Sequence, residues 1–467
     1  MGALDEDVSH MKLTRRAFLA TTTAAVFLPK VSVAQDYRIL RATTGTQHIG
    51  PEGFPDTKIW GYNGAVAGPT IRVKQGDRIA REFVNELPQG SSVHWHGIRI
   101  DNKMDGVVGL TQDAVASGDS FLYDFTVPDA GTYWYHPHNR TWEQMARGLY
   151  GPLIVEEANP PKVDRDEVFL IDDWRLTREG QIDESFGPSM DWSHGGRSGN
   201  WITINGRAPA DHPVQHNERL RLRLINVSNA RTYDLALDGL QGWIVALDGQ
   251  PLEVPIEADR LTLAPAQRAD FILDVTAVEG SKGALVMQNG DQVYYLAHFP
   301  VEGAAREVAL PTPDPLPLNP VPALGDLETA LRVDLLMEGG AMGRMRGAML
   351  NGEMKTMGEL VSNDLFWAFN GVAGLPEEPL LTAKIGETVR IKIINNTSFP
   401  HAMHLHGFHF RKIEEDGTQG PLRDTLLVER SEVAEIAFVA DNVGDWLFHC
   451  HMLEHTAAGM LTWLKVV

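Results

Sequence analysis

The single cysteine of the chain lies within a cluster of potential metal ligands near the C-terminus. Cys450 is flanked by His449 and His451, and His455 and Met460 follow shortly after. Two imidazoles, a thiolate and a weak thioether form the usual environment of a blue, electron-transferring copper ion. Cys450, His455 and Met460 therefore predict three donors of such a site, and another histidine must supply the fourth.

The spacing around Cys450 predicts a second metal site beside the first. Successive side chains of a β-strand point to opposite faces. His449 and His451 would therefore point together, away from the metal that Cys450 holds. We expect two metal sites to share this one short peptide.

The histidines of the chain are strongly clustered. Ten of the seventeen occur in four groups, which are His94 and His96; His136 and His138; His401, His404 and His406; and His449, His451 and His455. A spacing of two places both imidazoles of a pair on one strand face. His401 lies three residues before His404, so it faces the other way, alongside Cys450, as the fourth donor. The seven other histidines show no such pattern, and we assign them no role.

The strands expected to carry these histidines occur twice, in loosely repeated form. Residues 68–138 and 381–451 each contain alternating strands, a glycine turn, a His-x-His-Gly strand and a second strand with two histidines. Pairing the two repeats about a pseudo-twofold axis would bring eight imidazoles together between the first and the last domain.

The middle of the chain begins a similar unit without the ligands. Residues 219–226 alternate like the strands of the outer repeats, but Ala236 and Asp238 precede Gly239 where histidines would fall. We expect this domain to keep the fold and to bind no copper.

The pattern of short alternating strands with frequent Gly and Pro turns predicts an all-β protein of Greek-key β-sandwiches. A chain of 467 residues suggests about three domains. The predicted boundaries are domain one at 35–160, domain two at 161–309, a Pro-rich linker at 310–325, and domain three at 326–467.

The N-terminal sequence and the net charge indicate the cellular location and the class of partner. Residues 1–34 contain Arg15-Arg16, an apolar run and a small-residue end, which are typical of a twin-arginine export signal. The run is too short for a permanent membrane span. An acidic stretch precedes Met11, which is an alternative start. We therefore expect a periplasmic protein, for which a monomer suffices, and the net charge of −21 argues against nucleic acid as a partner.

These motifs together resemble the three-domain multicopper oxidases of the bacterial laccase and cuprous oxidase type, over essentially the whole mature chain. The resemblance implies three consecutive cupredoxin-like sandwiches, four copper ions per chain and O2 as electron acceptor. It implies the following ligands: His401, Cys450, His455 and Met460 for the type 1 copper; His94 and His404 for type 2; His96, His136 and His451 for one type 3 copper; and His138, His406 and His449 for the other.

The same resemblance implies a catalytic carboxylate. Asp105 would lie beside the type 2 copper, order water there and supply protons. A turn aspartate before Gly106 is the alternative interpretation. Asp424 matches a family aspartate near the type 1 region, and a structural role in a strand turn is equally consistent with its position.

A methionine-rich segment at 337–357 bears on the electron donor. Its six methionines suit Cu(I), and relatives that oxidise cuprous ion carry such a segment near this place. However, the spacing of Met342, Met345 and Met349 also fits a helix that packs on a core. In addition, the carboxylate and methionine that help cuprous oxidases hold their substrate are replaced by residues 397–400, Thr-Ser-Phe-Pro.

Three functions follow as hypotheses. The first is an oxidase of phenols or aromatic amines, and the axial Met460 implies a low type 1 potential that favours easily oxidised donors. The second is the same enzyme acting on Cu(I) in copper tolerance. The third is a non-enzymatic cupredoxin-fold protein of cell division, but such proteins have lost their ligands. Copper nitrite reductases lack histidines on both sides of the cysteine, which argues against that class.

Overall fold

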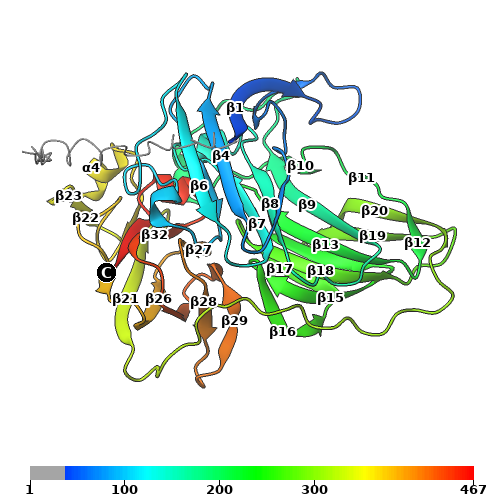
Figure 1. Cartoon of the computed structure of the whole chain (residues 1–467). Helices are drawn as coiled ribbons and strands as arrows, with labels where there is room; N and C mark the ends of the chain where they lie inside the picture. Colours follow the sequence, from blue (N-terminus) through cyan, green and yellow to red (C-terminus); the bar gives the residue numbers. More distant parts are fainter. Residues whose placement is uncertain (1–36) are drawn as a thin grey trace, which may run out of the picture. The chain divides into compact units, whose positions relative to one another are not determined.

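The structure, a computed structural model, describes residues 37–467, and the predicted export signal at 1–34 lies outside them (Figure 1). In the described part, regular structure is almost entirely β-strand, and the longest helices have five residues. The all-β prediction is therefore confirmed. No helix among these residues has the length and apolar character needed to cross a membrane.

The first sandwich consists of two four-stranded sheets. Their strand orders are β2-β1-β4-β6 and β3-β8-β7-β5. The element bounds are β1 Arg38–Gln47, β2 Thr57–Tyr62, β3 Ile71–Lys74, β4 Arg78–Asn85, β5 His94–His96, η1 Asn102–Met104, β6 Ser120–Thr126, β7 Gly131–His136, α2 Thr141–Gln144 and β8 Gly151–Glu156.

The middle sandwich, green in Figure 1, pairs two larger sheets. Their orders are β10-β9-β13-β18-β15-β16 and β11-β20-β19-β14-β17, with β12 also on β20. The bounds are β9 Arg165–Trp174, α3 Ser189–Ser193, β10 Trp201–Ile204, β11 Ala210–Asp211, β12 Val214–His216, β13 Arg219–Asn226, β14 Tyr233–Asp238, β15 Leu240–Leu247, β16 Gln250–Glu257, β17 Arg260–Leu263, β18 Arg268–Val275, β19 Lys282–Asn289 and β20 Gln292–Ala304.

The third sandwich follows after a long irregular connection from β20. Its sheets have the orders β24-β21-β26-β31-β28-β29 and β25-β33-β32-β27-β30, and a separate hairpin pairs β22 with β23. The bounds are β21 Leu331–Gly339, β22 Gly347–Leu350, β23 Glu353–Thr356, α4 Met357–Val361, β24 Trp367–Phe369, β25 Leu381–Ala383, β26 Thr388–Asn395, β27 His401–Leu405, β28 Phe410–Ile413, β29 Gln419–Arg423, β30 Thr425–Val428, β31 Val433–Val439, β32 Gly444–Cys450, α5 Leu453–Ala457 and β33 Leu461–Val466.

The first and third sandwiches share one continuous apolar core. Buried residues of both, such as Trp95, Tyr135, Ile391 and Phe448, belong to a single cluster, whereas the middle sandwich has its own. Burial of this apolar surface is the main favourable contribution to folding. It also holds the two histidine-bearing sandwiches against each other.

Strand β13 shows how the middle sandwich is attached. Its leucines face the middle core, and its alternating arginines are buried in ion pairs. Arg221, only 1% exposed, pairs with Asp270 of its own sheet and with Glu157, next to the end of β8. A buried charge is tolerated only when it is paired in this way.

The methionine-rich segment is not the helix that its spacing suggests. Residues 347–356 form the β22–β23 hairpin, with Met349 opposite Met354. Gly343 and Gly347 interrupt the segment, and glycine disfavours a helix interior by about 1 kcal/mol. The helical interpretation is therefore wrong, because turn and strand geometry prevail over the three- and four-residue spacing.

Candidate metal centres

The two outer sandwiches present their histidines in matching strand registers. On β5 and β7, His94 lies opposite His136. On β27 and β32, His404 lies opposite His449. The second histidine of each motif lies at the end of its strand or one or two residues beyond it, so the repeat seen in the sequence is also a repeat of strand pairing.

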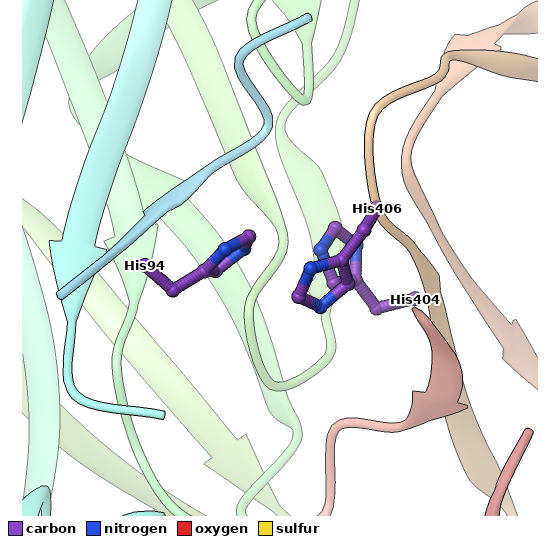
Figure 2. Close-up of side chains that lie close together, drawn as sticks. All are labelled: His94, His404 and His406. Atoms are coloured by element: carbon purple, nitrogen blue, oxygen red, sulfur yellow. The ribbon is translucent and has the colours of Figure 1, made fainter. Parts of the chain in front are cut away.

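The imidazoles of the two sandwiches pair reciprocally. His94 stacks on His406 with ring centroids 4.0 Å apart, and His96 stacks on His404 at 3.8 Å. Figure 2 shows His94 facing His404 and His406 from the opposite side. The first histidine of one motif thus meets the second of the other, as a twofold relation requires.

The second pair of motifs follows the same rule. His136 meets His451 at 5.2 Å between ring centroids, and His138 meets His449 at 5.3 Å. All eight rings predicted to converge between the domains therefore do so. Their roles as ligands remain predictions at this point.

A separate group of donors lies on the other face of β32. The Nδ1 atoms of His401 and His455 are 3.1 Å apart, and they lie 3.6 and 3.7 Å from the Cys450 sulfur. Met460 is buried, and its carbonyl accepts a hydrogen bond from the Cys450 amide. The structure therefore brings all four predicted type 1 residues to one place within the third sandwich.

The nitrogen atoms in the eight-histidine cluster are arranged for metal binding. Nε2 of His94 and Nε2 of His404 are buried without a hydrogen-bond partner in the described residues. His136 Nε2 lies 3.4 Å from His96 Nδ1 and 3.5 Å from His451 Nε2. His406 Nε2 lies 3.1 Å from His449 Nε2. Buried polar atoms without partners are uncommon, which points to a missing ligand.

Burial favours the neutral form of most of these imidazoles. It lowers the pKa of His138 to about 3 and that of His455 to about 4. The same cause holds the pKa well below its usual value at His96, His136, His401, His406, His449 and His451. A neutral imidazole has the free lone pair that a metal requires. Burial also raises the pKa of the Cys450 thiol to about 12, so metal binding must displace its proton.

Asp105 lies beside the eight-histidine cluster. Its carboxylate Oδ2 is 3.0 Å from His406 Nδ1, and its carbonyl is 2.8 Å from His94 Nδ1. Asp105 also ends η1 and precedes Gly106, whose φ is +82°. The turn role and the contact with the cluster are therefore both present in one residue.

Several contacts could not be foreseen from the sequence. Asp424, between β29 and β30, lies against His96 and His404 of the cluster, and Arg268 of the middle sandwich pairs with it. The His194 carbonyl, also from the middle sandwich, lies 2.6 Å from His455 Nε2. These contacts join residues far apart in the chain, and no spacing pattern in the sequence predicts them.

A cavity of about 330 Å³ opens beside the eight-histidine cluster. It reaches His136, His138 and His449, and its wall includes Trp142 and Trp192. The cavity therefore borders three histidines of the cluster.

The donor sets fit copper. Soft thiolate, thioether and imidazole donors suit copper in both of its common oxidation states, whereas calcium and magnesium prefer oxygen. The group around Cys450 and the all-imidazole cluster are thus of different types. The first is suited to electron transfer, and the second to copper ions that leave room for another ligand.

Comparison with known proteins agrees with this chemistry. Three family profiles described as multicopper oxidase match residues 43–160, 165–291 and 349–467. The multicopper oxidase MmcO of Mycobacterium tuberculosis is 29% identical, with 96% of this chain and 91% of that protein covered.

Solved structures give the same result. Lac15 from a marine microbial metagenome is 42% identical, with a TM-score of 0.75, over 92% of this chain and 99% of that one. A laccase-like multicopper oxidase, CueO, from Ochrobactrum sp. is 25% identical, with a TM-score of 0.78, over 93% and 98%. The predicted fold of three cupredoxin domains is confirmed, and the non-enzymatic alternative is set aside. The chain belongs to the multicopper oxidases, copper-dependent enzymes that use O2 as electron acceptor.

Proposed function

We propose that this enzyme is a laccase-like oxidase. It takes single electrons from phenols or aromatic amines and reduces O2 to water with four copper ions, one of type 1, one of type 2 and two of type 3. The observation that carries this proposal is the presence of two separate donor groups on opposite faces of β32. Such an arrangement separates electron uptake from O2 reduction.

The ligand assignment follows the two donor groups. His401, Cys450, His455 and Met460 hold the type 1 copper, and His94 and His404 hold type 2 through their free Nε2 atoms. One type 3 copper takes His96, His136 and His451, and the other takes His138, His406 and His449. We expect about four coppers per chain from elemental analysis. A protein that binds only one would contradict the cluster assignment.

The chain itself supplies the path between the two centres. Copper, when bound, supplies the one-electron redox chemistry. Cys450 is covalently joined to His449 and His451, so a few bonds of one peptide link the type 1 group to the cluster. The cavity beside His138 and His449 admits O2, and the largely apolar wall favours a small apolar molecule.

Asp105 is proposed as the residue that delivers protons to the cluster. It is 1% exposed and touches both His94 and His406, which come from the two outer sandwiches. Its Oδ1 makes no hydrogen bond in the described residues and lies 3.3 Å from His94 Nδ1. Catalysis of proton transfer requires such a group within hydrogen-bond reach of the reacting atoms.

The surroundings of the type 1 group favour an aromatic donor. Trp367 packs on His401 and His455, with centroids 5.1 and 4.4 Å away, and Phe399 packs on Trp367 and His194. Aromatic rings prefer offset and edge-to-face contacts, and a phenol ring could pack on these side chains in the same way. The Ochrobactrum relative is described as having oxidase activity towards lignin model compounds, which supports the same class.

Cu(I) is the second candidate donor. Met342 is 77% exposed and Met354 is 70% exposed, so two thioethers are available at the surface. The other four methionines of the segment are buried or partly buried, and Met337 is fully buried in the core. Four of the six methionines therefore have packing roles, and the two exposed thioethers are available to bind Cu(I).

Oxygen uptake with a phenol and with Cu(I) distinguishes the two donors. The double variant Met342→Leu/Met354→Leu keeps apolar volume and removes both exposed thioethers. A laccase-like enzyme keeps its phenol turnover and its Cu(I) turnover in this variant. A selective loss of Cu(I) turnover, with a wild-type preference for Cu(I) over the phenol, would instead favour the copper-tolerance function.

We further propose that the enzyme works as a monomer in the periplasm, exported by the twin-arginine pathway. The support is the Arg15-Arg16 pair and the apolar run of residues 1–34. Cell fractionation of the full chain and of Arg15→Lys/Arg16→Lys tests the location. Retention of the variant in the cytoplasm is expected, and equal export of both proteins would refute the pathway.

A further inference from the structure

The middle sandwich has no predicted copper ligand, yet one of its side chains binds a carboxylate that contacts the cluster. Arg268, at the start of β18, is fully buried. Its Nη1 and Nη2 donate to Asp424 at 2.8 and 2.6 Å, and its Nε donates to the Thr132 carbonyl at 3.2 Å. Thr132 belongs to β7 of the first sandwich and Asp424 to the third. Arg268 therefore joins all three sandwiches at one point.

Asp424 carries this contact to two histidines of the cluster. Its carbonyl accepts a hydrogen bond from His404 Nδ1 at 2.9 Å, which leaves His404 Nε2 as the free atom. Its carboxylate Oδ1 lies 3.4 Å from His96 Nε2, an electrostatic contact without a hydrogen bond in the described residues. Groups that hold the outer nitrogen of a ligand histidine fix its tautomer and orientation.

The space for the ion pair depends on a glycine of the His-x-His-Gly motif. Gly97 has a φ of +86°, and a Cβ there would clash with Arg268 Nη2 and lie 2.6 Å from Asp424 Oδ2. The corresponding glycine of the third sandwich, Gly407, instead faces Trp446. Because Gly97 has no side chain, the ion pair between Arg268 and Asp424 fits between the sandwiches.

Other atoms of the middle sandwich hold the same loop. Gln267 Nε2 donates to the Thr425 carbonyl at 3.0 Å, and the Asp248 carboxylate lies 3.8 Å from Arg423 Nη1. The loop that carries Asp424 is therefore held from the middle sandwich on both sides of the ion pair.

We propose that Arg268 is a positioning residue through which the middle sandwich sets His404 and His96 for the type 2 copper and its type 3 neighbour. This inference rests on the ligand assignment proposed above. Arginine suits the role because its planar fork binds a carboxylate through two parallel hydrogen bonds, which lysine cannot reproduce.

The test compares Arg268→Lys and Arg268→Gln with Arg221→Gln. Arg221 is a matched control, since it is equally buried and paired with two carboxylates, Glu157 and Asp270, and no contact between either of them and a cluster histidine is found in the described residues. Each purified protein is titrated with a copper chelator while the type 2 paramagnetic signal and the type 1 blue absorption are followed. Loss of contacts of this kind lowers metal affinity by about 10- to 100-fold.

We expect both Arg268 variants to lose type 2 copper at about 10- to 100-fold lower chelator concentration than wild type, with type 1 absorption per chain unchanged. The Arg221 variant should behave as wild type. Equal chelator sensitivity in all variants, with a normal wild-type signal, would overturn the inference alone. A wild-type protein without a type 2 signal would instead overturn the ligand assignment.

Removing one partner of a buried pair can prevent folding. If Arg268→Gln does not fold, Arg268→Lys and Asp424→Asn decide the question, because both keep most of the side-chain volume. In the second of these variants the main-chain carbonyl at position 424 still accepts from His404, so only the contact through the carboxylate is lost. Type 2 copper retained at wild-type affinity in both of these variants would refute the positioning role.

Discussion

The first and third sandwiches share one histidine face but differ on the other. Pro137 stands between His136 and His138, as Cys450 stands between His449 and His451. Ser91 likewise precedes His94 by the spacing that separates His401 from His404. Where the third sandwich gathers sulfur and imidazole, the first has Ser91 hydrogen-bonded to Gln144 at 2.7 Å. The same pair of strands therefore supports a metal site on one face in both domains, and on the second face in only one.

This difference shows that the two centres have different structural requirements. The type 1 group lies wholly within the third sandwich, whereas the cluster takes half of its imidazoles from each outer sandwich. Damage to the domain interface should therefore affect the cluster first. Substitutions on one face of β32 should spare the other face.

Cys450→Ser gives the largest expected effect. Serine keeps the volume but removes the only thiolate, so the intense blue band should disappear and donor oxidation should fall to background. Copper content should drop by about one ion per chain, because the cluster lies on the other face. Optical spectra and elemental analysis check this, and a persistent blue band would contradict the type 1 assignment.

His404→Ala tests the cluster while leaving the type 1 group in place. It removes one proposed type 2 ligand, so O2 uptake should be abolished while the blue band remains. Under anaerobic conditions the donor should still bleach that band. His212→Ala, in the middle sandwich and away from both centres, is the control. Concerted loss of both signals in the His404 variant would show that the two faces are not independent.

Asp105→Asn tests the carboxylate shared by both halves of the cluster. The amide keeps the size but cannot deliver a proton, and we expect turnover with O2 to fall by about 10²-fold. Anaerobic reduction of the type 1 centre should be unchanged. Asp101→Asn, at the other end of η1 and exposed, should match wild type. Stopped-flow measurement of the two half-reactions distinguishes these steps, and a slower type 1 reduction would contradict the assignment.

The metal-free protein should lose stability as the pH falls below about 6.5. His138 and His455 have folded-state pKa values of about 3 and 4, below the unfolded value, so the unfolded chain binds more protons in this range. Their contribution is complete above about pH 6.5 and decreases on acidification. At about pH 5 each costs on the order of 2 kcal/mol. Thermal unfolding of the apoprotein between about pH 7.5 and 5 checks this, and a flat profile would contradict it.

Ser91→Ala gives the smallest expected effect. It tests whether the second face of the first sandwich contributes only to stability. It breaks the buried hydrogen bond to Gln144 on the face of the first sandwich that lacks a metal site. The free energy of unfolding should fall by about 1 kcal/mol. The blue band and O2 uptake should stay at wild-type values. Any loss of copper in this variant would show that this face also supports the cluster.

Local spacing predicted much of this molecule. Strand parity placed His401 with Cys450, and the pairing of the two repeats brought the eight imidazoles together between the first and the last domain, because both depend on period-two geometry that the sequence displays directly. The same kind of reasoning failed at Met342 and Met349, where glycines favour turns and a hairpin over the helix that the spacing suggested.

Contacts from the middle sandwich could not be predicted. Arg268 belongs to a strand whose alternation predicts burial but not its partner, and Asp424 follows it by 156 residues. Asp424 was placed near the type 1 region by resemblance, whereas the structure puts it on the cluster side. Such long-range ion pairs depend on how whole sandwiches dock, which no local pattern records.

The carbonyl of His194 has a consequence of its own. It is a main-chain group, and it covers the outer nitrogen of His455 from a loop of another domain. The oxygen comes from the main chain whatever amino acid stands at position 194, while the imidazole of His194 makes separate contacts with Phe399 and Ser193. Substitutions in that loop can therefore change the surroundings of His455 without altering a residue of the proposed metal sites.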